Sequence, residues 1–314
     1  MSEPRPEKLL LLDSASMYFR AFHGVPETMT APDGTAVNAV RGFLDAIARL
    51  VTDFRPTQVI AAFDADWRPQ WRVDLVPSYK AHRVDGGVEA AAAGSTVEEV
   101  PDLLGPQVPV IEDLLDAIGI ARIGVRGFEA DDVLGTVAAT WPDPVDVVTG
   151  DRDLFQVVDD ARHVRVLYNA RGYAKLEVLD EAGVLARHGV PPQQYADLAL
   201  LRGDSSDGLP GVPGVGEKTA AGLLARFGSV DALLLALDDP AVDVPKRPAL
   251  VAARDYLVAA GPVVRVRDDL SLPHVDAQLS PAPRDPDALA RLEHRWGVES
   301  SVGRLRAAIE RSLG

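Results

Sequence analysis

The chain alternates between short apolar runs and longer segments whose apolar residues recur at helical spacing. Residues 8–14, KLLLLDS, and 56–66, PTQVIAAFDAD, are apolar runs that end in acidic residues, a pattern typical of buried strands. Between them, residues 37–51, VNAVRGFLDAIARLV, place apolar side chains three and four positions apart, which predicts a helix. Strands that alternate with helices in this way predict a parallel sheet with helical crossovers.

The same alternation continues through the middle of the chain. Helices are expected where apolar residues keep helical spacing, at 108–119 and 128–141. Strands are expected where short runs rich in Val and Ile occur, at 120–125, 144–151 and 163–169. The fold class that follows is α/β, with a mostly parallel central sheet flanked by helices.

Acidic residues recur where these predicted elements end or begin. Asp13, Asp64 and Asp151 each lie at or just past the end of a predicted strand. Open α/β sheets place their ligands at that edge. Glu129, Asp131 and Asp132 open the helix that follows the strand near 120–125, with Glu129 and Asp132 on one helical face and Asp131 on another. Several carboxylates are therefore expected to meet at one place.

Taken singly, each of these acids has a plainer explanation. An Asp at a strand end is more often a turn residue or a helix cap than a ligand, and acids in a first helical turn complement the helix dipole. Several such coincidences at one sheet edge favour a shared site. Carboxylate oxygens without His or Cys suit Mg²⁺ or Mn²⁺. The six His are scattered and form no HExxH pair, which argues against zinc.

The most specific segment of the second half is 198–229, which contains LPGVPGVGEKTA. Its glycines predict tight turns that expose backbone N–H groups beside a helix starting near Glu217, with Lys218 as a point charge, and this suits a phosphate. It follows a helical pattern and lacks Walker spacing, so a helix–hairpin–helix that grips a nucleic-acid backbone fits best. The plain alternative is a Gly/Pro-rich interhelical loop. Asp204 and Asp207 precede it and suit either a metal or a capped turn.

Composition changes this picture in two ways. The net charge of −15 would by itself argue against a nucleic-acid partner, but the location of the basic residues matters more than the sum. The chain has no cysteine, which excludes disulfides and thiolate metal sites and fits a cytoplasmic protein. No run of 18 apolar residues occurs, so no membrane association is expected.

The stretches DSASMYFRAFH, FDADWRPQWRVDLVPSYKAHR, EADDVLGTVA, TGDRDLFQVV and LRGDSSDGLPGVPGVGEKTA resemble, in order over roughly 9–230, the motifs of the bacterial 5′-nuclease family. These are the 5′-3′ exonuclease and flap endonuclease domains found at the front of DNA polymerase I and as separate enzymes. The resemblance implies a PIN-like α/β core over 1–180 with a helical arch at about 67–106. It also implies a helical region over 181–314 that holds the helix–hairpin–helix clamp at about 198–229.

The resemblance also implies roles for single residues. The acids expected around a first divalent ion are Asp13, Asp64, Glu129, Asp131 and Asp132, and those around a second are Asp151, Asp153, Asp204 and Asp207. Lys80, Arg83 and Arg20 fall on catalytic positions, and Tyr79 on a position that stacks against a base. Gly211, Gly214, Gly216, Lys218 and Thr219 fall on the duplex-binding element, whose backbone carbonyls hold a K⁺ ion in some members.

The expected function is cleavage of DNA near 5′ ends, at 5′ flaps, nicks or 5′-ended duplexes, by a monomer that uses two ions of Mg²⁺ or Mn²⁺. Two such ions clamp the attacking and leaving oxygens of a phosphodiester. Two alternatives stay open: a PIN-like ribonuclease, which the duplex clamp argues against, and a non-catalytic DNA-junction binder, which the full set of acids argues against.

Two segments depart from the strongest part of the pattern. Residues 84–106, where the arch should continue, are acidic and rich in small residues instead of basic. Residues 240–314 contain proline breaks followed by an amphipathic end, and we expect them to pack as helices against the core without contributing chemistry.

Overall fold

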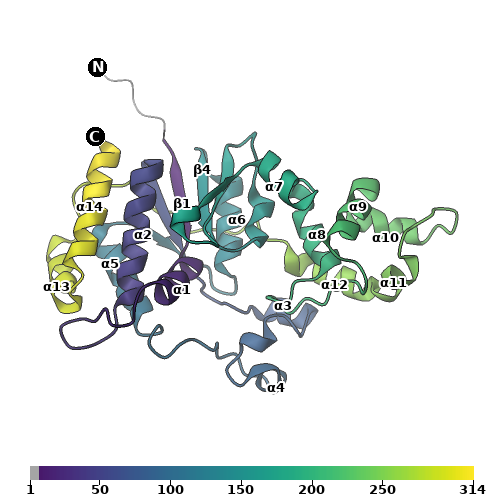
Figure 1. Cartoon of the computed structure of the whole chain (residues 1–314), viewed down its shortest axis with the longest axis horizontal. Coiled ribbons are helices and arrows are strands. Elements are labelled where there is room, and N and C mark those ends of the chain that lie inside the picture. Colours follow the sequence, from purple (N-terminus) through teal and green to yellow (C-terminus); the bar gives the residue numbers. More distant parts are fainter. Residues whose placement is uncertain (1–6) are drawn as a thin grey trace.

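The protein is built around one six-stranded sheet (Figure 1). The computed structural model describes residues 7–314, so residues 1–6 of the expected first domain lie outside it. The strand order is β3-β2-β1-β4-β5-β6, and every neighbouring pair is parallel except β5 and β6. The strands are β1 Leu9–Asp13, β2 Gln58–Ala62, β3 Ala121–Ile123, β4 Val145–Thr149, β5 Val164–Tyr168 and β6 Glu177–Leu179. This confirms the α/β class and the mostly parallel sheet.

Helices cover both faces of the sheet because the central strands are apolar on both sides. Successive side chains of a strand point to opposite faces, so Leu9 and Leu11 pack with α6 while Leu10 and Leu12 pack with α1, α2, α5 and α14. The bounds of these helices are α1 Ser14–Gly24, α2 Asn38–Phe54, α5 Gln107–Ile118, α6 Ala130–Thr140 and α14 Glu299–Leu313. The result is a three-layer arrangement, and its buried sheet carries the acids at the strand ends.

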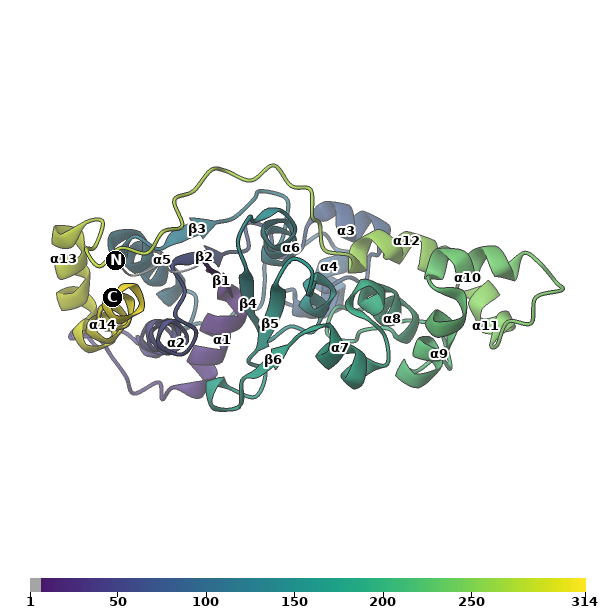
Figure 2. The ribbon, with the colours of Figure 1, turned by 90° about the horizontal axis from the view of Figure 1, so that it is seen from above.

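A second group of helices extends from one end of the sheet and makes the molecule elongated (Figures 1 and 2). It comprises α7 Glu181–His188, α8 Tyr195–Arg202, α9 Glu217–Phe227, α10 Val230–Leu237, α11 Arg247–Ala252 and α12 Arg254–Val264. Its apolar side chains form one continuous core with the α6 face of the sheet. The helical region therefore has no separate core, and its loops are held in place relative to the strand ends.

Residues 265–285 carry the chain back across the sheet to the opposite end of the molecule (Figure 2). On the way, the Leu279 amide donates to the Thr57 carbonyl at 2.9 Å, beside the start of β2. The last two helices, α13 Pro286–Trp296 and α14, then pack on α5 and α2. The C-terminal part thus packs as helices against the core, as expected.

The segment 67–106, expected to form the arch, contains only short helices. They are α3 Gln70–Leu75, the 3-10 turn Ala81–Arg83 and α4 Gly87–Ala92. Backbone bonds close the segment beyond the turn: the Asp85 amide donates to the Val97 carbonyl and the Glu99 amide to the Arg83 carbonyl, both at 2.8 Å. Figure 1 shows α4 standing off from the body of the molecule.

Within residues 7–314, no single helix is long and apolar enough to span a membrane, and the pair α9 and α10 passes that test only together, across a 79° bend.

Candidate active site

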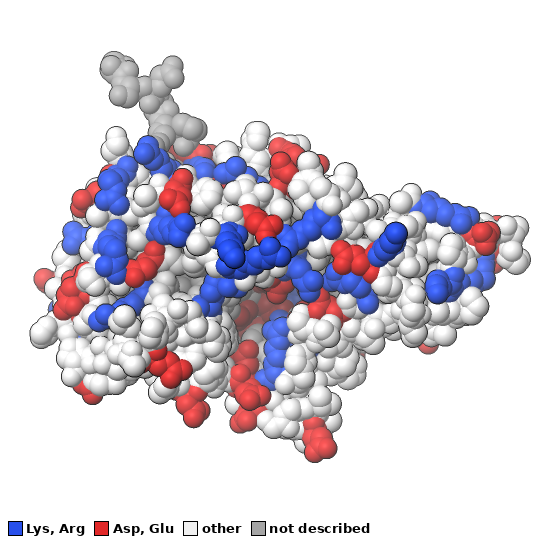
Figure 3. Space-filling view, in the orientation of Figure 1, with Lys and Arg blue, Asp and Glu red and all other residues white. Residues whose placement is uncertain are grey.

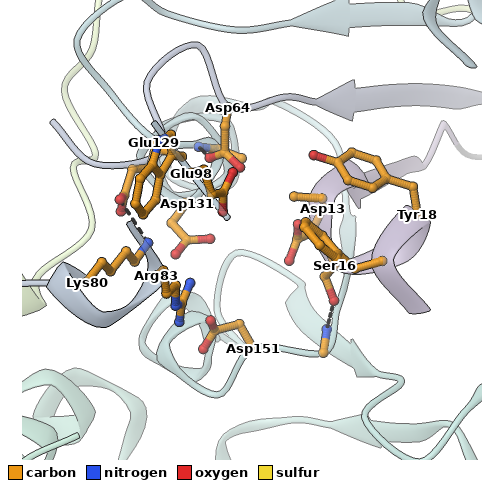
Figure 4. A pocket seen from close by; sticks show the side chains of 15 residues that line it. Asp13, Ser16, Tyr18, Asp64, Lys80, Arg83, Glu98, Glu129, Asp131 and Asp151 are labelled. Atoms are coloured by element: carbon orange, nitrogen blue, oxygen red, sulfur yellow. Dashed lines mark hydrogen bonds and ion pairs between the residues drawn. The ribbon is translucent and has the colours of Figure 1, made fainter. Parts of the chain in front are cut away.

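The expected acids from three different strand ends meet in one pocket of about 250 Å³. Asp13 ends β1, Asp64 follows β2 and Asp151 follows β4. Asp131 enters from the first turn of α6, and all four carboxylates point toward the same space (Figure 4). Parallel strands carry their carboxyl ends to one sheet edge, which is why residues 138 positions apart in sequence become neighbours.

Asp13 combines a capping role with its place in the pocket. Its Oδ1 accepts from the Ser16 amide at 3.0 Å, which makes it the N-cap of α1, and its Oδ2 accepts from the Thr149 hydroxyl at 2.7 Å. Each carboxylate oxygen has a second lone pair that these bonds leave available. The capping explanation and the ligand explanation are therefore compatible at this residue.

The first turn of α6 aims its acids in two directions. Asp64 caps this helix from outside, since its Oδ1 accepts from the Ala130 amide at 2.7 Å. Asp131 lines the pocket, whereas Asp132 is fully buried on the other side of the helix. Glu129, the N-cap residue, reaches the edge of the pocket with its carboxylate.

Burial, together with the charges of neighbouring acids, raises the pKa values of Asp13 and Asp131. Burial, with smaller contributions from Asp64 and Asp151, raises the pKa of Asp13 to about 7 despite its two hydrogen bonds. Burial and the charges of Asp151 and Asp13 hold the pKa of Asp131 well above its usual range. Carboxylates that resist ionisation beside one another are stabilised when a cation lies between them.

A second acidic group lies beside the first. Burial, with the charges of Asp151, Asp207 and Asp204, holds the pKa of Asp153 well above its usual range. Burial, followed by the charge of Asp207, also raises the pKa of Asp151. Asp151 is thus shared between the two groups. Asp204 and Asp207 come from the loop between α8 and α9, so the helical region supplies half of the second group.

Two of the three expected cationic residues reach the pocket. Lys80 Nζ contacts Glu129 Oε1 at 2.8 Å, and Arg83 Nη2 contacts Asp207 Oδ1 at 3.1 Å. Lys80 thus pairs with an acid of the first group, as Figure 4 shows, and Arg83 with an acid of the second. Arg20 lies behind the end of β4, with its Nη2 3.3 Å from the position a Cβ on Gly150 would take, and does not line the pocket.

The expected clamp residues lie before and at the start of α9, where Gly214, Gly216 and Lys218 are exposed, Thr219 is half-buried and Gly211 is buried. This helix begins at Glu217, as the sequence predicted, and Gly216 is its N-cap. Lys218 is exposed, and Gly211 and Gly214 have φ of 66° and 75°. Figure 3 shows Lys and Arg side chains along the rim of a hollow whose interior is acidic. A polyanion would therefore meet positive charge at the rim despite the negative net charge.

The donor chemistry of the pocket suits hard divalent cations. All its candidate ligands are carboxylates. Mg²⁺ and Mn²⁺ prefer carboxylate oxygen ligands over the nitrogen of His or the sulfur of Cys. Among residues 7–314, no three acidic or histidine side chains are drawn together tightly enough to form a preassembled metal-binding group. Partly hydrated ions do not require such a group, because Mg²⁺ keeps several of its waters.

Comparisons with known proteins agree with this geometry. Residues 8–189 match the family described as 5′-3′ exonuclease, N-terminal resolvase-like domain, and residues 190–287 match 5′-3′ exonuclease, C-terminal SAM fold. The chain belongs to the 5′-3′ exonuclease family. It is 58% identical over 298 residues to a 5′-3′ exonuclease of Streptomyces coelicolor, covering 94% of this chain and 98% of that one.

A second relative supports this family assignment, and a solved structure shares the fold. A 5′-3′ exonuclease of Mycobacterium tuberculosis is 56% identical over 315 residues, covering 96% of this chain and 98% of that one. A crystal structure of the bacteriophage T5 flap endonuclease with DNA and metal ions shares the fold, with a TM-score of 0.63, 17% identity and 98% of both chains covered. The resemblance inferred from the motifs is confirmed. The expected boundary at 180/181 stays a prediction, and the two family matches meet at 189/190.

The structure places Tyr79 differently from the role expected within this family. Its side chain is buried, with 2% of the residue exposed, and its hydroxyl donates to Glu129 Oε2 at 2.8 Å. The ring packs in the core, so in this conformation it cannot stack against a base. The surrounding stretch, DLVPSYK, gave no sign of this because burial depends on contacts distant in sequence.

Several pocket residues escaped the sequence reasoning. Tyr18, Phe19 and Trp67 are aromatic residues that line the pocket, and Glu98 enters it from the arch segment. Burial, followed by the charge of Asp64, raises the pKa of Glu98. The aromatic residues lie inside the motifs DSASMYFRAFH and FDADWRPQW, so a closer look at side chains next to the acids would have found them.

The burial of Arg72 and its pairing with two acids were not predicted from the sequence. It is 2% exposed, and its guanidinium contacts Glu129 Oε2 and Asp132 Oδ1, both at 2.8 Å. Asp132, expected around the first metal, is thereby held away from the pocket. The stretch WRPQWR indicated basic and aromatic character, but nothing local in it marks one arginine as buried.

Proposed function

We propose that this member of the 5′-3′ exonuclease family hydrolyses DNA phosphodiesters near 5′ ends at junctions of duplex and single strand, with bound divalent cations. The observation that carries the proposal is the convergence of Asp13, Asp64, Asp131 and Asp151 in one pocket that Lys80 and Arg83 also enter. The bacteriophage T5 flap endonuclease, which has the same fold, is known with DNA and metal ions, and this supports the assignment.

The pocket residues divide the work between holding cations and holding phosphate. Asp13, Asp64 and Asp131 would hold one cation, and Asp151 with its neighbours would hold a second, either Mg²⁺ or Mn²⁺. Such cations lower the pKa of bound water and stabilise charge on the oxygens of the phosphodiester. Lys80 and Arg83 face the same space and would stabilise negative charge on the phosphate.

The loop before α9 would bind the duplex at a distance from the cut. Lys218 and the amides around Gly216 suit a backbone phosphate at a helix N-terminus. A K⁺ ion on the loop's backbone carbonyls, a monomeric state and a cytoplasmic location belong to the same proposal. In this arrangement the duplex is fixed at the helical region while its 5′ end enters the acidic pocket.

The proposal is tested by mapping products on 5′-flap, nicked and blunt DNA, and on an RNA flap of the same sequence, with Mg²⁺ and with Mn²⁺. We expect metal-dependent cuts close to the junction in DNA and little cutting of RNA. Asp151→Ala and Asp153→Ala should each abolish turnover and retain junction binding, because these residues would hold cations, whereas Lys218 and the amides around Gly216 would bind the duplex.

The outcomes separate the candidate functions. Preferential cutting of the RNA flap would favour the ribonuclease. Junction binding by the wild type, with neither cleavage nor Mn²⁺ uptake in calorimetry, would favour the non-catalytic binder. Normal cleavage by both aspartate variants would refute the two-cation assignment.

A further inference from the structure

Asp131 and Asp132 are adjacent acids with opposite surroundings. Asp131 lines the pocket, and burial with the charges of Asp151 and Asp13 raises its pKa. Asp132 is 0% exposed and accepts hydrogen bonds from Arg72 Nη1 and Nη2, the Glu129 amide and the Arg267 amide, at 2.8 to 3.3 Å. A carboxylate has about four lone-pair sites, so these donors leave none free for a metal ion.

The partner of Asp132 joins three parts of the molecule. Arg72 belongs to α3 at the base of the arch segment, and its guanidinium binds acids at the start of α6. Its Nε donates to the Val263 carbonyl at 3.2 Å, in the last turn of α12. The fork geometry of Arg suits a carboxylate bound through two parallel bonds, and a lysine cannot reproduce it.

The segment after α12 is held by the same pair. The Arg267 amide donates to Asp132 Oδ1 at 3.0 Å, and Thr136 Oγ1 donates to the Arg267 carbonyl at 3.2 Å. Gly135 allows this approach, since a Cβ there would stand 2.5 Å from that carbonyl. The end of the helical region is therefore attached to the helix that carries the pocket acids.

We propose that Arg72 and Asp132 form a positioning pair that fixes the first turn of α6, so that Asp132 is not a metal ligand while Asp131 and Glu129 face the pocket. The pair also fixes the end of α12 against that turn, and so fixes the position of the helical region relative to the pocket. This inference rests on the proposed function for its catalytic consequence, but its structural part stands on the buried contacts alone. Removing one member leaves the other as an unpaired buried charge, which is strongly destabilising.

The neighbouring substitutions Asp131→Asn and Asp132→Asn make a matched test, with Mn²⁺ as the probe. In metal-free buffer, Asp132→Asn should lower the unfolding temperature by about 5–10 °C, since it breaks a buried ion pair. Asp131→Asn should leave the unfolding temperature unchanged or raise it, because it removes a buried carboxylate that neighbouring acids repel. In calorimetry at a temperature where both are folded, Asp131→Asn should weaken Mn²⁺ binding about tenfold or more.

The stability of metal-free protein decides between the two roles of Asp132. Loss of a ligand cannot destabilise protein that holds no metal. If Asp132→Asn kept the metal-free unfolding temperature of the wild type and lost Mn²⁺ affinity as Asp131→Asn does, the positioning pair would be refuted. Hydrogen exchange adds a local readout: the Arg267 amide should exchange faster in Asp132→Asn and not in Asp131→Asn.

Arg72→Lys keeps the positive charge but cannot form the two parallel hydrogen bonds to the carboxylate. It therefore tests whether Arg72 positions the first turn of α6, in a protein that still folds. We expect kcat on flap DNA to fall about ten- to hundredfold with KM little changed, because Arg72 orients the pocket and lies too deep to touch DNA. A rise in KM at constant kcat, or no effect, would overturn the role. If the wild type cleaves no DNA, the proposed function fails. The unfolding temperatures and the hydrogen exchange still test whether Arg72 and Asp132 form a positioning pair.

Discussion

At the scale of single residues, the pocket uses side chains whose hydrogen-bonding capacity is only partly consumed. Asp13 caps α1 and accepts from Thr149, yet still faces the pocket. Asp132 has the same chemistry, but four donors saturate it. What separates a candidate metal ligand from a structural acid here is the number of free lone pairs and not the residue type.

The raised pKa values predict an unusual dependence of stability on pH for the metal-free protein. Between 3.8, the ordinary value for Asp, and about 7, folded Asp13 keeps a proton that the unfolded chain has lost. In this pH range folding takes up a proton, so raising the pH disfavours the folded state. The contribution of Asp13 to stability is therefore fully present below pH 4 and is lost as the pH rises through 7. For each such group the free energy of unfolding falls by up to about 1.4 kcal/mol per pH unit. Thermal unfolding with a chelator at pH 5, 6, 7 and 8 measures it.

Two controls accompany that experiment. Mg²⁺ or Mn²⁺ should restore stability mainly at the higher pH, where the carboxylates are ionised and bind cations. Asp131→Asn should flatten the dependence, because it removes one raised group and relieves Asp13. Metal-free stability that rises steadily from pH 5 to 8 would show that the acids are not coupled in this way.

Prediction from sequence worked for residues whose role follows from position along an element. The acids at strand ends were found because parallel strands deliver them to one edge. The roles of Tyr79 and Arg72 were not, because both depend on burial against Glu129, 50 and 57 positions away. Pairwise contacts at that separation leave no periodic pattern in a single sequence.

At the scale of elements, the loop before α9 is locked to the base of the arch by one close approach. Gly208 has φ of 71°, and a Cβ there would stand 2.1 Å from the Ser78 carbonyl. The Lys80 amide donates to the Asp207 carbonyl at 2.9 Å in the same contact. This approach places Lys80 and Arg83 beside the acids of the loop.

We therefore expect Gly208→Ala to force the arch base and the loop apart. The backbone strain should lower the free energy of unfolding by about 1–3 kcal/mol, and turnover should fall further than stability explains. Gly222→Ala in α9 is the matched control, since nothing lies within 4 Å of its Cβ position, and it should be neutral or stabilise by about 0.5–1 kcal/mol. Denaturant unfolding and flap cleavage measure both; equal behaviour of the two variants would contradict the lock.

Elements with a strong period were predicted, as was the three-residue strand β3, whereas α1 and β6 were not. The start of α9 at Glu217 and the strands β1, β2 and β4 followed from pattern alone. Helix α1 was missed because its residues, SASMYFRAFHG, mix polar and aromatic side chains around the pocket. The strand β6 was missed because its three residues, EVL, belong to no longer apolar run, unlike the equally short β3 in IARIGV.

At the scale of the whole molecule, the chain crosses its own sheet so that the last helix packs on α2, at the end opposite the clamp (Figure 1). The path of 265–285 could not be predicted, because the contacts that hold it, such as Arg267 to Asp132 and Leu279 to Thr57, join residues far apart in sequence. Its consequence is that α14 lies at the end of the molecule opposite the helices that follow the pocket (Figure 1).

This separation yields a prediction about the salt dependence of DNA binding. Each phosphate contact releases counterions, so replacing one contacting lysine lowers the slope of log affinity against log salt by about one. Lys218→Ala should therefore weaken binding to a nicked duplex and reduce that slope. Arg311→Ala, which removes one exposed charge in the last turn of α14, should leave it unchanged even though both variants alter the net charge equally. Titrations between 50 and 200 mM salt measure the slopes. Equal slopes for both variants would mean that the net charge, not the clamp, governs binding.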